Sequence, residues 1–158
     1  MKRNNFFRTT LMLLLIFSFS CVSLLGQTNS EACELIFYRP AQGAMSGGAG
    51  ADLKIYINDQ EVGTLANGTV LKYSVFSEGN LKIKFTGIMM GSTTGQPKVL
   101  NVDVAHGKTI EFSTSINFPK GADAVVLEKP KDKEKMKKEK WADTMEGKED
   151  LEKPLIVK

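Results

Sequence analysis

The sequence has 158 residues, of which 42% are hydrophobic, enough for one modest core and too few for two. The formal net charge of +3 comes from the N-terminal segment, because removing Lys2, Arg3 and Arg8 leaves 18 basic and 18 acidic residues. A neutral remainder gives no electrostatic basis for binding nucleic acid. We therefore expect one domain with no nucleic-acid partner.

Residues 1–26 have the order of a secretory signal peptide. The basic stretch MKRNNFFR precedes an apolar run, and QTNSEA forms a polar boundary after it. The apolar run from Leu11 to Leu25 is short for a membrane span, which needs about 20 residues. We place cleavage after Gly26, so that residues 27–31 form a short linker. We expect export to the periplasm, to the outer membrane or out of the cell.

Cys21 in FSFSC offers a second interpretation of this segment. The stretch could be a degenerate lipobox, in which the thiol is lipidated after cleavage and anchors the protein to a membrane. Ser18 stands where a branched apolar residue is expected, and VSLLG continues the apolar run. A plain cleaved signal is therefore favoured, and a lipid anchor at Cys21 is the only membrane contact that the sequence suggests.

Residues 32–127 read as short strands separated by turns. Leu53, Ile55 and Ile57 alternate with polar neighbours, as in a strand with one buried face. NDQ and ANG then reverse the chain twice, because Asn-Gly favours a tight turn. Even spacing continues at Leu81, Ile83 and Phe85, at Leu100, Val102 and Val104, and at Ile110, Phe112, Ile116 and Phe118. We predict a single antiparallel β-sandwich of seven or eight short strands, with TGIMMGSTTGQP as a loop.

Residues 128–158 differ sharply in composition, with ten Lys and nine acidic residues. Such a segment buries too little apolar surface to offset the entropy of ordering it. We expect a charged low-complexity tail that is disordered or carries a fraying helix around residues 136–145. Alternatively the tail binds a partner: Trp141 and Met145 would share one helical face, and PLIV could add to a strand edge.

Residue types that perform catalysis are scarce after the signal. His106 is the only histidine and precedes Gly107 in a turn, while Cys33 lies on an expected strand among apolar neighbours. We interpret them as a turn residue and a core residue. Met89 and Met90 could join His106 in binding copper, but adjacent strand residues point in opposite directions. We expect no enzyme, no cofactor and no metal.

Arg39 is the one charged residue whose position suggests more than solvation. It ends the first strand before Pro40, where its guanidinium could pair with a carboxylate, bind loop carbonyls or reach a ligand. The structural roles are favoured. In the ligand-binding alternative, the loops at residues 40–50 and 87–97 form the walls of the site.

LIFYRP, LKIYINDQEVGTLANGTVLKYSV, SEGNLKIKF and HGKTIEF follow one another between residues 32 and 118. Their order resembles a family of bacterial exported domains of unknown function, the family numbered twenty-eight forty-six. The later motifs are also similar to PEGA-type sandwich repeats of surface proteins. Because these motifs are mostly turns, the resemblance implies a fold and not an activity. Members are often lipoproteins, whereas the lipobox at Cys21 departs from the usual pattern.

These features predict a non-catalytic exported β-sandwich that acts as an interaction or accessory module at the bacterial cell envelope. Its partner would be another envelope protein or a cell-surface component, reached through strand edges, loops or the tail. The alternative is a small-ligand or carbohydrate-binding domain that uses loops 40–50 and 87–97. Sugar sites usually need exposed aromatic residues, and neither loop contains one, which favours the interaction module.

Overall fold

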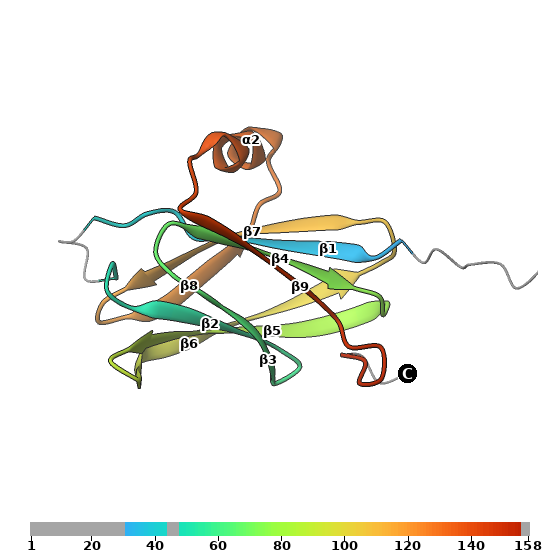
Figure 1. Cartoon of the computed structure of the whole chain (residues 1–158), viewed down its shortest axis with the longest axis horizontal. Coiled ribbons are helices and arrows are strands. Elements are labelled where there is room, and N and C mark those ends of the chain that lie inside the picture. Colours follow the sequence, from blue (N-terminus) through green and yellow to red (C-terminus); the bar gives the residue numbers. More distant parts are fainter. Residues whose placement is uncertain (1–30, 44–47, 156–158) are drawn as a thin grey trace, which may run out of the picture.

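The computed structural model describes residues 31–43 and 48–155, so the expected signal peptide and Cys21 lie outside the described residues. The described chain forms nine strands and one helix (Figure 1). In chain order they are β1 Cys33–Tyr38, β2 Asp52–Ile57, β3 Gln60–Leu65, β4 Thr69–Val75, β5 Gly79–Met89, β6 Ser92–Val104, β7 Thr109–Asn117, β8 Gly121–Val126, α2 Pro130–Lys138 and β9 Asp143–Lys148.

The strands form one mixed sheet that nearly closes into a barrel, in the order β3-β2-β5-β6-β8-β7-β1-β4-β9. The all-β prediction is confirmed, but the antiparallel sandwich of seven or eight strands is wrong. β1 runs parallel to β7 and β9 parallel to β4, while β6 and β8 share the single parallel pair Gln96↔Gly121. Alternation reports which face of a strand is buried and not which strand lies beside it, so it could not predict this order.

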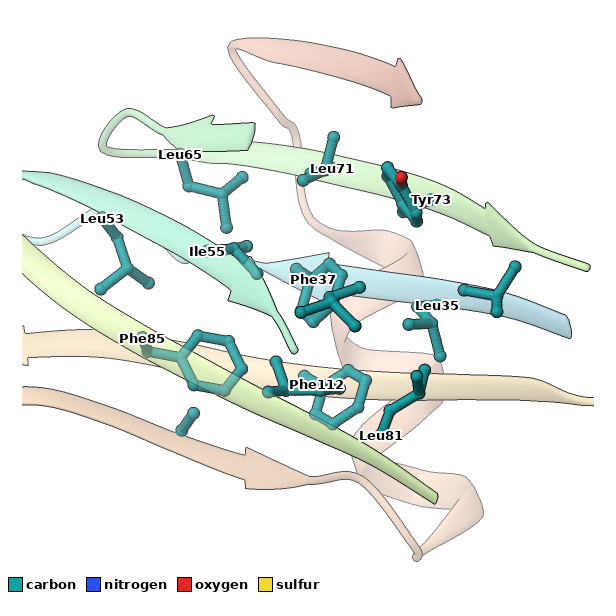
Figure 2. Packing of buried hydrophobic residues seen from close by; sticks show 14 of the residues in the cluster. Leu35, Phe37, Leu53, Ile55, Leu65, Leu71, Tyr73, Leu81, Phe85 and Phe112 are labelled. Atoms are coloured by element: carbon teal, nitrogen blue, oxygen red, sulfur yellow. The ribbon is translucent and has the colours of Figure 1, made fainter. Parts of the chain in front are cut away.

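The core fills the inside of the barrel with side chains from the predicted apolar faces. Leu53, Ile55 and Ile57 are fully buried, as their alternation predicted. At the centre, the ring of Phe37 stacks on that of Phe112 with centroids 4.8 Å apart and meets the ring of Phe85 edge-on at 5.9 Å (Figure 2). Each such pair adds about 0.5–1.5 kcal/mol beyond the burial of its surface.

The segment predicted as a loop at residues 86–97 is largely a hairpin arm. β5 continues to Met89 and β6 begins at Ser92, so only Met90 and Gly91 form the turn. Phe118, predicted to face the core, lies beyond the end of β7 and is 62% exposed. The alternation of buried and exposed side chains holds only within a strand, so the even spacing of Phe118 did not predict its burial after β7 ends at Asn117.

The expectation of a disordered tail is corrected for residues 128–155. Helix α2 lies on the outside of the barrel (Figure 1), where Met136 and the half-buried Trp141 pack on Tyr38 and its apolar neighbours. β9 pairs with β4 over six positions. The helix ends at Lys138, so Trp141 and Met145 do not share a helical face: Met145 lies in β9 and packs against the barrel core. Backbone pairing and a few well-placed apolar side chains order the segment despite its charge.

Two buried carboxylates attach this segment to the barrel. Glu111 on β7 is 2% exposed and pairs with Lys133 at 3.4 Å and Lys137 at 3.3 Å, two positions on one face of α2. Glu149 accepts hydrogen bonds from the Phe76 and Ser77 amides, the Ser77 hydroxyl and the Leu155 amide. Burial opposes its charge, but the four donors together hold the pKa of Glu149 below its usual value.

Candidate interaction surface at the loop end of the barrel

Three connections meet at one end of the barrel, on the left in Figure 1. The Gln42 side chain donates to the Ile116 carbonyl at 3.2 Å and accepts from the Ile116 amide at 3.4 Å. The amide of Gln96 donates to the Lys120 carbonyl at 3.0 Å. The two loops named as walls of a ligand site therefore lie together, with the β7–β8 turn between them. We call described residues 41–43, 48–50, 87–97 and 117–120 the loop end.

Two glycines fix the hairpin arm onto the β7–β8 turn. A Cβ atom added to Gly95 would lie 2.3 Å from the Cα of Gly121, and both residues have positive φ angles, 66° and 111°. The backbones touch so closely that no side chain fits at either position. The arm and the turn therefore form one unit.

The most exposed apolar side chains of this surface are Met90 and Phe118. Met90 is 100% exposed at the tip of the β5–β6 hairpin, while Met89 faces the core. Met90 and Gly91 have φ angles of 50° and 79°, which suit a two-residue turn favouring Asn, Asp or Gly. A methionine there costs about 1–2 kcal/mol in backbone conformation and gains nothing from burial. Residues held in such conformations are often found at functional sites.

The loop end is also nearly free of charge. The hairpin stretch GIMMGSTTGQP and the turn NFPK contain one charged residue, Lys120. The opposite end carries exposed ionisable groups, among them His106, whose amide donates to Glu78 at 3.1 Å. An uncharged exposed surface with large apolar side chains is typical of an interaction site.

Arg39 lies behind the loop end and is fully buried. Its guanidinium donates to the carbonyls of Leu65 at 2.5 Å, Gly48 at 2.9 Å and Ala51 at 2.5 Å. Burial lowers the pKa of the guanidinium, and the nearby Asp52 carboxylate offsets part of this effect. The sequence left three roles open for Arg39, namely pairing with a carboxylate, bonding to loop carbonyls and reaching a ligand. The structure shows hydrogen bonds from Arg39 to backbone carbonyls. The Nε atom is the one buried side-chain polar atom of the described chain without a hydrogen-bond partner.

The candidate metal and nucleophile residues do not come together. His106 follows β6 and Met90 precedes it, so the thirteen residues of that strand separate them. Cys33 is buried at the start of β1, and burial raises the pKa of its thiol. Across the described ranges, no three His, Cys, Asp or Glu side chains gather where they could hold a metal ion.

Two surface hollows lie beside β9, one along β1 and β4 and the other where β4 and β9 end. One, of about 410 Å³, is lined by Glu34, Lys72, Ser74, Glu146, Gly147 and Lys148. The other, of about 420 Å³, is lined by Phe76, Lys148, Glu149, Asp150 and Leu151. Neither includes a residue of loops 40–50 or 87–97, and sequence reasoning missed both because β9 was not predicted.

No protein-family model, curated protein or solved structure matches this chain. Within residues 31–43 and 48–155, no helix is long and apolar enough to cross a membrane. The resemblance of residues 32–118 to the exported family twenty-eight forty-six and to PEGA-type repeats stays a prediction.

Proposed function

We propose that this chain is a non-catalytic exported module that binds another component of the bacterial cell envelope through its loop end. The observation that carries the proposal is the exposure of Met90, whose side chain is fully exposed although its backbone has a positive φ that disfavours methionine. Met90 lies at the tip of the β5–β6 hairpin, and this hairpin is fixed to the β7–β8 turn that carries Phe118. Burying each side chain against a partner would gain about 1.5–3 kcal/mol. This free energy of binding would offset the cost of exposing the Met90 and Phe118 side chains in the free protein.

The second candidate is a small-ligand or carbohydrate-binding domain. It is supported by the convergence of loops 40–50 and 87–97 around Ile116. The even spacing of Phe118 in the sequence had suggested that this residue faces the core. In the structure, Phe118 is an exposed aromatic side chain beside these loops. Binding of a sugar there would require Phe118 but not Met90, so single substitutions separate the two candidates.

Site-specific photo-crosslinking tests the interaction module. A photoreactive residue is placed at position 90, at position 118 or, as a matched control, at Leu151, which is 71% exposed and lies outside the loop end. Irradiation in an envelope fraction should give a shared adduct from positions 90 and 118 and none from 151. The same pattern at all three positions, or no adduct at 90 and 118, would rule out the loop end as the binding surface.

Export is tested separately by mass spectrometry of the protein recovered from its host. A chain that begins at Gln27 is expected from the proposed signal peptide. A diacylglycerol-modified Cys21 at the N-terminus would instead establish the lipid anchor. An intact Met1 would contradict both forms of export.

A further inference from the structure

We infer that the envelope component bound by the loop end is the surface of a lipid bilayer, entered by Met90 and Phe118. This inference rests on the proposed function and names its partner. It adds a second membrane contact to the Cys21 anchor considered from the sequence.

The composition of the loop end fits a bilayer interface. Charged side chains are costly to place among acyl chains, and the hairpin and the β7–β8 turn have none apart from Lys120. Lys120 directly follows Phe118 and Pro119 and is exposed, so its ammonium group can remain among lipid phosphates while the ring enters. Apart from Ile88, Met89 and Pro97, the remaining side chains of the arm are Ser, Thr and Gln, which suit the polar headgroup layer.

The shape of the loop end also favours a bilayer over a protein pocket. Met90 and Phe118 stand on two separate turns, and β6 and β8 run parallel away from them, so both turns end the barrel on the same side. A protein partner would need two pockets at a matching separation. A bilayer interface needs only that the projecting side chains reach about 5–10 Å into the boundary between headgroups and acyl chains.

The turns are held in place before any partner arrives. The contact between Gly95 and Gly121 and the hydrogen bond from Gln96 to Lys120 join the hairpin arm to the turn. A backbone held in place in this way loses little conformational freedom on binding, which favours association.

Vesicle flotation tests this inference with residues 27–158, which contain every described strand and helix. Vesicles of phosphatidylethanolamine and phosphatidylglycerol should carry the wild type and the control Leu151→Ser to the top of a gradient. The double variant Met90→Ser, Phe118→Ser should bind at least about tenfold more weakly, because two apolar side chains lose their burial. Circular dichroism verifies that each variant is folded.

Fluorescence locates the contact independently. Tryptophan is introduced at Phe118 or, as a control, at Leu151, with Trp141 as the same background in both. Lipids brominated along their acyl chains should quench the Phe118→Trp protein selectively. Absence of flotation by the wild type, equal flotation of the double variant or equal quenching at both positions would each overturn the inference. A crosslinked envelope protein at positions 90 and 118 without vesicle binding would overturn it while leaving the proposed function intact.

Discussion

The ring of Trp141 stacks on the ring of Tyr38 with centroids 5.4 Å apart and planes 28° from parallel. The indole Nε1 donates to the Met136 carbonyl at 3.2 Å, and the Tyr38 hydroxyl donates to Glu111 at 3.3 Å. The charged C-terminal segment is thus joined to β1 by the aromatic stack and to β7 by the ion pairs of Lys133 and Lys137 with Glu111. Removal of this segment should therefore destabilise the whole barrel.

Deleting residues 130–158 should lower the thermal midpoint by more than about 10 °C, because burial of Met136, Trp141 and Leu155 is lost together with the β4–β9 pairing. Differential scanning calorimetry measures the change. Trp141→Ala should give a smaller fall in the same direction. An unchanged midpoint after the deletion would mean that the segment contributes nothing to the fold.

Glu111→Gln should destabilise the protein by about 1–3 kcal/mol, because Lys133 and Lys137 lose the buried anion that they share. Urea denaturation measures the loss. Glu134→Gln removes a carboxylate from the exposed pair with Lys138 and should change stability by less than about 1 kcal/mol. Equal effects of the two substitutions would contradict a special role for the buried pair.

Glu149 should make stability fall as the pH is lowered. Its folded pKa lies below its usual value of 4.5, so the unfolded chain takes up the proton first and the stabilisation is lost as the pH falls through the folded pKa. Unfolding free energies measured between pH 6 and about pH 3 should decline less steeply in Glu149→Gln than in the wild type. Parallel pH profiles would show that this carboxylate is not responsible.

Gly95→Ala should destabilise the barrel by about 2–4 kcal/mol, because the new methyl group would overlap the Gly121 backbone at a positive φ. Gly50→Ala is the matched control, since an added Cβ there meets nothing within 4 Å. Chemical denaturation compares the two. Tolerance of Gly95→Ala would mean that the hairpin arm is not fixed to the β7–β8 turn.

Met90→Asn should raise stability by about 0.5–1 kcal/mol while weakening binding, because Asn suits the turn and removes the projecting apolar side chain. Thermal denaturation and vesicle flotation of the same preparation measure both effects. A gain in stability without a loss of binding would show that the methionine has no part in the interaction.

Local signals in the sequence predicted the strands but not their arrangement. Asn58 and Asp59 both have positive φ angles in the predicted NDQ turn, and Gly68 does in the ANG turn, which confirms the two reversals. β1 pairs in parallel with β7 although β2 to β6 lie between them in the chain, and alternation does not encode such a long-range pairing. β9 was missed because its sequence, DTMEGK, is mostly polar and pairs along an edge.

The loop end was predictable only in part. Residues 40–50 and 87–97 were considered as two walls of one ligand site, and in the structure both contact Ile116, although residues 87–97 are largely a hairpin arm. Met90 was considered as a copper ligand, and Phe118 was taken to continue the apolar face of its strand. Exposure depends on where a strand ends, and β7 ends one residue before Phe118. The ion pairs of Glu111 with α2 could not be predicted from the sequence, because Glu111 occupies an ordinary outward position on its strand. They become visible only when the helix is packed against β7.

The pairing of β9 with β4 also bears on how the chain is made. β4 receives its second neighbour from residues 143–148, which are synthesised after the other eight strands of the sheet. A nascent chain that stops before them presents an unpaired edge that other copies could extend into an aggregate. Synthesis of β9 is therefore what covers the outer edge of β4, and a chain in which β9 has not yet been made carries that edge exposed.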